Sequence, residues 1–187
     1  RSATDCQAVR RTTKDQRQRV FFWGKKELGV KRVLIVCTAN ICRSPMVAGV
    51  LRARLAAAGL AKQVEVRSAG VYARAGDKAS AYGVELLNAK KIDISQHMAA
   101  PITEMDLQQS DLILVMEEKH RQSLFHYSPA DLYKVLLLSE LAGERFDLKD
   151  PYGQNKAAYA STLALIERTI DVGWPTFLAR LGLVIGK

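Results

Sequence analysis

The sequence predicts an α/β fold, a four-stranded parallel sheet with helices on both faces. Two observations carry this prediction. From Lys31 onward, short apolar runs rich in β-branched residues alternate with stretches whose apolar residues recur at helical spacing, an order typical of strands joined by crossover helices. The chain has 187 residues, 48% of them hydrophobic and 25% charged, which suffices for one domain with a sizeable core.

Each expected element rests on its own pattern. Four runs are expected to form the strands: Val33 to Cys37, Gln63 to Arg67, Asp111 to Met116 and Val135 to Leu138. Helices are expected at Ser44 to about Leu60, Ala79 to Ala89, Glu117 to Phe125, and Lys156 to about Arg180. The first helix is expected to open with Ser44 as its N-cap and Pro45 as its first residue. A turn is expected at Ser68-Ala69-Gly70, after the second strand.

The first 30 residues differ in composition from the rest of the chain. They hold 8 Lys/Arg and 3 Asp/Glu, against 20 and 16 in residues 31–187. We expect a basic, poorly ordered N-terminal extension followed by one domain over residues 31–187. The alternative is an anchor to a partner or a membrane surface through Phe21-Phe22-Trp23. Because the domain itself is only mildly basic, no nucleic-acid binding is expected.

The cysteines and the hydropathy limit the cellular context. Cys6, Cys37 and Cys42 are the three cysteines, and no Cys or His pair lies near Cys37 and Cys42 at the spacing of zinc ligands. We therefore expect no metal and no cofactor. An odd number of cysteines favours a reducing compartment, and we expect a cytoplasmic protein. No apolar run approaches the roughly 20 residues that a membrane helix needs.

The segment after the first strand has the pattern of an anion site. We call Cys37 to Ser44 the phosphate loop; it reads Cys-Thr-Ala-Asn-Ile-Cys-Arg-Ser and lies between a buried strand and a helix start. Such a loop turns backbone N–H groups toward one point, where the helix dipole favours negative charge. Arg43 adds a planar fork for two phosphate oxygens. The same field favours a thiolate at Cys37, placed to attack phosphorus in line.

This segment resembles the active-site signature of the low-molecular-weight protein tyrosine phosphatases, and the likeness covers nearly all of residues 31–187. Further motifs follow in the family's order: Ser68-Ala69-Gly70, Asp93 to His97, Asp111 to Glu117 and Asp150-Pro151-Tyr152. The stretch Leu112 to His120 and the segment Asp150-Pro151-Tyr152 most resemble the bacterial members linked to exopolysaccharide production.

The resemblance implies a role for each site residue. Cys37 is the nucleophile, Arg43 the phosphate clamp and Asp150 the general acid, with Asp147 as a rival acid. The residues expected to brace the loop through hydrogen bonds are Asn40, Ser44, Ser68 and His97. The residues expected to surround the substrate are Thr38, Ala39, Asn40, Ile41, Cys42, Ser44 and Tyr152, the last as a wall that stacks on an aryl ring or as a surface turn residue.

Two positions of the loop raise questions of their own. The family usually has Gly where this chain has Ala39, and a methyl group would strain the loop by roughly 1–2 kcal/mol if that residue needs a positive φ. Cys42 lies five residues from Cys37 and is expected either to form a reversible disulfide with the oxidised nucleophile or to be a small buried hydrophobe. No role is expected for His120 and His126.

The expected activity is hydrolysis of phosphotyrosine through a cysteinyl-phosphate intermediate. The alternatives are a phosphate-binding module with little turnover, an arsenate reductase that uses external thiols, since no Cys follows Cys42, and a phosphoarginine hydrolase. Enzymes of the last kind tend to carry Thr where this chain has Ile41, whose apolar side chain suits an aryl ring. The resemblance implies a phosphotyrosine-containing protein as partner, such as an autophosphorylated tyrosine kinase of a polysaccharide export system.

Overall fold

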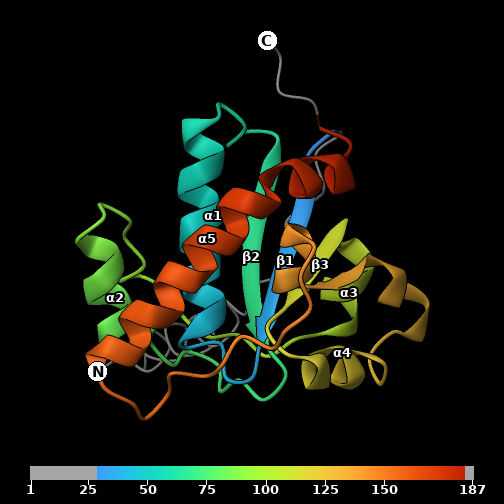
Figure 1. Cartoon of the computed structure of the whole chain (residues 1–187). Helices are drawn as coiled ribbons and strands as arrows, with labels where there is room; N and C mark the ends of the chain where they lie inside the picture. The colour runs from blue at the N-terminus through green and yellow to red at the C-terminus, as the bar shows by residue number, and fades with distance from the viewer. Residues whose placement is uncertain (1–28, 184–187) are drawn as a thin grey trace, which may run out of the picture.

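The computed structural model describes residues 29–183, and the expected α/β fold is confirmed (Figure 1). Four parallel strands form one sheet in the order β2-β1-β3-β4. Their bounds are β1 Lys31–Cys37, β2 Val64–Gly70, β3 Leu112–Val115 and β4 Val135–Leu137. Residues 1–28 lie outside the described residues, so the disorder expected of the extension stays a prediction.

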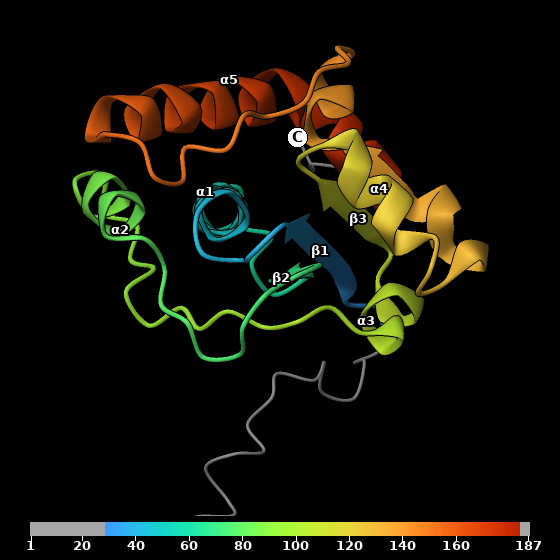
Figure 2. The ribbon, with the colours of Figure 1, turned by 90° about the horizontal axis from the view of Figure 1, so that it is seen from below.

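Helices cover both faces of the sheet, as expected. Their bounds are α1 Arg43–Ala57, α2 Ala81–Asn88, α3 Glu104–Gln109, α4 Glu118–Leu124 and α5 Lys156–Leu181, with 3₁₀ helices at Pro129–Lys134 and Leu138–Ala142. Figure 2 shows α1, α2 and α5 together on one side of the sheet. Inward side chains of β1 alternate between two cores: Val33 and Ile35 pack with these three helices, whereas Leu34 and Val36 pack with α3 and α4.

One expectation about local structure is wrong, and one short helix was not expected. Ser68-Ala69-Gly70 is no turn, because β2 runs through Gly70, which pairs with Cys37. The glycine is needed there for close approach: a Cβ on Gly70 would lie 2.6 Å from the carbonyl oxygen of Thr38. The helix that was not expected is α3, which begins after a capping box formed by Thr103 and Asp106.

The strand order brings the functional segments to one end of the sheet. The carboxyl end of β1 lies between those of β2 and β3, since Cys37 pairs with Gly70 and Val36 with Val115. The chain leaves β1 into the phosphate loop at this end, seen below the sheet in Figure 1. Carboxyl ends of parallel strands are where ligands bind in such folds.

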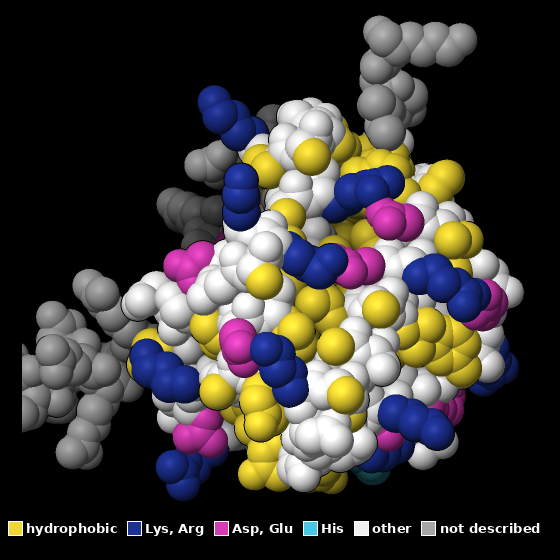
Figure 3. All heavy atoms as spheres, turned by 60° about the vertical axis from the view of Figure 1, so that its left-hand side comes forward, with side chains coloured by type: hydrophobic (Ala, Val, Ile, Leu, Met, Phe, Trp, Pro, Cys, Tyr) yellow, Lys and Arg dark blue, Asp and Glu magenta, His cyan; other side chains and the backbone are white. Residues whose placement is uncertain are grey.

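The surface gives no sign of a large field of one charge on the face that Figure 3 shows. Lys and Arg side chains are interspersed there with Asp and Glu, which is typical of a solvated surface. Within residues 29–183, no helix is long and apolar enough to cross a membrane.

Candidate active site

The phosphate loop joins the end of β1 to the start of α1. Cys37 is the last residue of β1 and is 3% exposed. Helix α1 begins at Arg43, so Ser44 is its second residue and not the expected N-cap. The Ser44 hydroxyl lies 2.9 Å from Cys37 Sγ instead, and no side chain caps α1. The start of α1 therefore offers its backbone N–H groups to an anion beside the Cys37 sulfur.

Asn40 is the residue that fixes the shape of the loop. It is fully buried and has a φ of 58°, a conformation that Asn tolerates better than most residues. Its Nδ2 donates to Ser44 Oγ at 2.8 Å, and its Oδ1 accepts from the Ala100 N–H at 2.9 Å. His97 Nε2 donates to the Asn40 carbonyl oxygen at 2.7 Å. Burial lowers the pKa of His97, which favours the neutral ring in this brace.

The strain suspected at Ala39 is absent, because Asn40 and not Ala39 has the positive φ in the loop. We therefore expect Ala39→Gly to bring no relief and to lower the free energy of unfolding by about 0.4–1 kcal/mol, since glycine adds freedom to the unfolded chain. Turnover should stay within about twofold of the wild type, because the loop conformation is already allowed for alanine. Urea unfolding and steady-state rates measure the two effects; a marked rise in turnover would show that Ala39 does strain the loop.

Arg43 lies under the loop with its guanidinium fully buried. Its Nη1 donates to a Glu117 carboxylate oxygen and to the Leu148 carbonyl oxygen, the latter at 2.8 Å. Its Nη2 donates to Asp150 Oδ2 at 2.5 Å and to Thr38 Oγ1 at 3.3 Å. Its Nε is buried and has no hydrogen-bond partner among the described residues. Burying this N–H group without a partner costs free energy, and a ligand that accepts a hydrogen bond from it would remove that cost.

Glu117 and His120 belong to this site, although the sequence analysis gave His120 no role and did not single out Glu117. Glu117 follows β3 at the carboxyl end of the sheet, and its pKa is lowered by hydrogen bonds from Lys119 and Arg43 that outweigh burial. His120 is fully buried, with Nε2 2.9 Å from Thr38 Oγ1. The available signal was position: Glu117 lies just after the expected third strand, and His120 lies about one helical turn after Glu117.

The buried ring of His120 predicts an acid-sensitive fold. Burial, and then the positive charge of Arg43, lower the pKa of His120 from 6.5 to about 4. The unfolded chain therefore takes up this proton first, so the contribution of His120 is full above pH 6.5 and falls as the pH drops toward 4. We expect the free energy of unfolding to fall by about 2 kcal/mol between pH 7 and pH 5 through this residue.

Urea unfolding at the two pH values measures this effect. The variant His120→Asn should lose that part of the pH dependence, while His97, whose pKa is also lowered, keeps its own smaller part. An unchanged pH dependence in the variant would contradict the assignment.

Asp150 reaches the site from the segment before α5, whereas Asp147 does not. Asp150 is half-buried, pairs with Arg43, and accepts from the Tyr152 N–H at 3.1 Å. Asp147 instead accepts from the Glu118 N–H at 2.8 Å, at the start of α4. Tyr152 is 68% exposed, so its ring belongs to the rim, and stacking on a substrate stays a prediction.

Cys42 points away from the rim into the core. Its Sγ lies 3.1 Å from the Tyr159 hydroxyl, and burial raises the pKa of the Cys42 thiol. Burial, and then this contact, also raise the pKa of Tyr159 to about 12. Cys37 and Cys42 are both free thiols.

The loop spacing still predicts a redox role for Cys42. Peroxide would oxidise Cys37 to a sulfenic acid, and the Cys42 thiol would displace water from it to form a disulfide. We expect dithiothreitol to restore most activity after peroxide treatment of the wild type, and much less in Cys42→Ser. Equal recovery in both proteins would leave Cys42 as a buried small hydrophobe.

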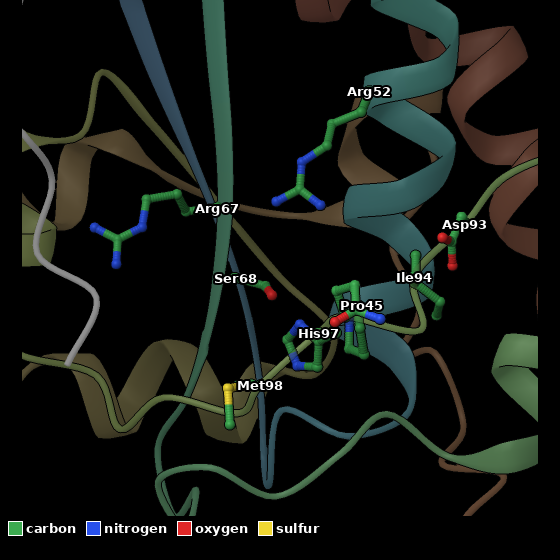
Figure 4. A pocket seen from close by; sticks show the side chains of 9 residues that line it. Pro45, Arg52, Arg67, Ser68, Asp93, Ile94, His97 and Met98 are labelled. Atoms are coloured by element: carbon green, nitrogen blue, oxygen red, sulfur yellow. The ribbon is translucent and has the colours of Figure 1, made fainter. Parts of the chain in front are cut away.

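Ser68 lies in β2 and lines a pocket of about 250 Å³ behind the loop (Figure 4). His97 and Pro45 share this pocket, and the Arg52 guanidinium covers the edge of β2 by donating to the Val66 carbonyl oxygen from two nitrogens. The lining includes neither Cys37 nor Arg43. The pocket therefore lies behind the loop and is not its substrate-binding face. A hydrogen bond from Ser68 to the loop stays a prediction. Within residues 29–183, no group of three or more His, Cys, Asp or Glu side chains could hold a metal ion.

Comparison with known proteins places this geometry in context. The family model described as low molecular weight phosphotyrosine protein phosphatase matches residues 32–179. The chain is 37% identical over 150 residues to a probable low molecular weight protein-tyrosine-phosphatase, EpsP, of Ralstonia nicotianae, covering 80% of this chain and 98% of that protein. It is 34% identical over 139 residues to a protein-arginine-phosphatase of Bacillus subtilis, covering 74% and 91%.

A solved structure shares the fold. The low molecular weight protein tyrosine phosphatase from T. tengcongensis superposes with a TM-score of 0.74 at 39% identity, covering 78% of this chain and 99% of that one.

Proposed function

The chain belongs to the low molecular weight phosphotyrosine protein phosphatase family, and we propose that it hydrolyses phosphotyrosine on proteins through a cysteinyl phosphate at Cys37. Relatives that act on tyrosine and on arginine phosphates are both phosphatases. Both kinds of relative remove a phosphoryl group from a protein side chain, and phosphotyrosine is the substrate that we propose for this chain.

One observation carries the proposal: Arg43 is fully buried, aligned by Glu117 and the Leu148 carbonyl, and has a buried Nε without a partner among the described residues. A phosphoryl oxygen is the acceptor that suits this donor together with the N–H groups at the start of α1. The sulfur of Cys37 lies at the same point, since Ser44 of that first turn contacts it.

The residues suggest the order of the chemical steps. A bound phosphoryl group competes with Asp150 for Arg43 Nη2, and its negative charge favours the neutral, proton-donating form of that carboxyl group. Cys37 attacks phosphorus, the bond to the tyrosyl oxygen breaks, and Asp150 gives its proton to that oxygen. Water then attacks the cysteinyl phosphate while Asp150 takes a proton back, which releases inorganic phosphate and restores the thiolate.

Ile41 is the observation that favours tyrosine over arginine. Its side chain is partly buried and packs against the core that includes α1, and its carbonyl oxygen accepts from the Ser80 N–H at 2.7 Å. An apolar side chain held at this place suits an aryl ring better than a charged guanidinium. An autophosphorylated tyrosine kinase is the substrate protein that the family resemblance supports.

A panel of matched phosphopeptides tests the proposal. One sequence carrying phosphotyrosine, phosphoserine or phosphoarginine at the same position is assayed for released phosphate. We expect phosphotyrosine to be hydrolysed fastest, by at least about tenfold in kcat/KM, because a misfitting side chain loses transition-state positioning. Preference for phosphoarginine would assign the chain to the other activity of the family. Phosphate binding without release from any peptide would leave only a binding module.

A further inference from the structure

A second pocket, of about 480 Å³, lies between the start of the segment after β2 and helix α4. Its lining includes Tyr72, Lys119, Gln122, Ser123, His126 and Tyr127. Tyr72 is 78% exposed, so one wall is an aromatic ring open to solvent. None of these side chains takes part in the phosphoryl chemistry proposed above.

The two segments that carry the walls of this pocket both contact Thr38, the residue after Cys37. The Tyr72 N–H donates to the Thr38 carbonyl oxygen at 2.9 Å. Helix α4, which carries the other wall, contacts the same residue through His120, which lies outside the lining and has its Nε2 2.9 Å from Thr38 Oγ1. The two segments that line the pocket therefore both contact the phosphate loop, which places the pocket within reach of residues that flank a phosphotyrosine bound in the loop.

The side chains that line the pocket favour an acidic group as its occupant. Its ionisable side chains other than the two tyrosines are Lys119 and His126, and it contains no carboxylate. Lys119 Nζ pairs with Glu117 at 2.8 Å and its side chain is 63% exposed. An ammonium group has three donors, so Lys119 can also donate to a second carboxylate that approaches from the solvent side. Gln122 and Ser123 add neutral hydrogen-bonding groups.

We infer that this pocket is a substrate subsite that receives an acidic residue flanking the phosphotyrosine of the protein substrate. The inference rests on the proposed function and deepens it by naming a sequence preference. Charged groups at such a rim act mainly on specificity and capture of the substrate rather than on the chemical step.

Paired phosphopeptides test the subsite. Each pair has the same phosphotyrosine and differs only in flanking Asp and Glu against Asn and Gln, and p-nitrophenyl phosphate serves as a substrate without flanks. We expect the wild type to prefer the acidic peptide by about threefold to tenfold in kcat/KM, the range for one or two exposed ion pairs. Gln122→Glu, which places a carboxylate in the exposed lining, should abolish or reverse the preference and leave p-nitrophenyl phosphate within about twofold, because like charges repel.

The matched control is Gln63→Glu, which makes the same charge change. Gln63 directly precedes β2 and therefore lies at the opposite end of the sheet from the phosphate loop. This variant should keep the preference. Equal rates for the paired peptides in the wild type, or equal loss of preference in the two variants, would overturn the subsite while phosphotyrosine hydrolysis stands. Absence of phosphotyrosine hydrolysis on every substrate would overturn both the subsite and the proposed function.

Discussion

Replacing Cys37 by serine should lower turnover of every phosphomonoester by about 10³-fold or more, because an alcohol is far less ionised and less nucleophilic than a thiol. The change replaces one sulfur atom by oxygen and leaves the side chain beside the Ser44 hydroxyl. Thermal unfolding of the variant should therefore remain close to that of the wild type. Steady-state release of phosphate from a nitrophenyl phosphate measures the loss.

Cys42→Ser is the matched control for this experiment. It makes the same change five residues along the same loop, where the sulfur faces Tyr159 rather than the start of α1. At least a tenth of the activity should survive there. If Cys37→Ser retained a tenth of the wild-type rate, Cys37 could not be the nucleophile.

Replacing Asp150 by alanine should slow phosphotyrosine hydrolysis by about 10²–10⁴-fold, the usual contribution of a positioned general acid. The tyrosyl oxygen leaves as a phenol whose pKa is about 10, so its departure needs a proton at neutral pH. An activated nitrophenyl or fluorinated coumarin leaving group needs that proton less, and its rate should fall much less. The basic arm of the pH–rate profile should also flatten, because that arm reports loss of the acid's proton.

Asp147→Ala separates the two candidate acids. Asp147 accepts from the Glu118 N–H at the start of α4, so its loss should cost stability by about 0.5–2 kcal/mol, as for a lost helix cap. It should leave the ratio of rates for good and poor leaving groups unchanged. A selective effect of Asp147→Ala, or equal slowing of both leaving groups by Asp150→Ala, would refute the general-acid role of Asp150.

The sequence predicted the parts of the site that are contiguous in the chain. The strand ending at Cys37, a helix directly after the loop and the alternation of elements are local patterns, and all three are confirmed, although the helix begins at Arg43 rather than after Ser44. The Asn40 brace by His97 agrees with the resemblance and is visible as a hydrogen bond.

What the sequence analysis missed depends on pairing between distant segments. That β2 continues through Gly70 follows from the pairing of Gly70 with Cys37, and no local signal separates this glycine from a turn glycine. Glu117 and His120 acquire meaning only when β3 lies beside β1. Ser44 is no N-cap and Ala39 has no positive φ, because the phosphate loop sets the backbone there and local rules for caps and glycines do not.

The proposed mechanism is tested most directly by trapping the covalent intermediate. Asp150→Ala enzyme, in which hydrolysis of the intermediate also lacks its base, is mixed with a fast nitrophenyl phosphate, quenched within one turnover and examined by mass spectrometry. We expect one added phosphoryl group per chain, located on the peptide that contains Cys37 and absent when Cys37 is also replaced by serine. No adduct in a variant that still releases nitrophenol in a burst, or an adduct on a different peptide, would contradict it.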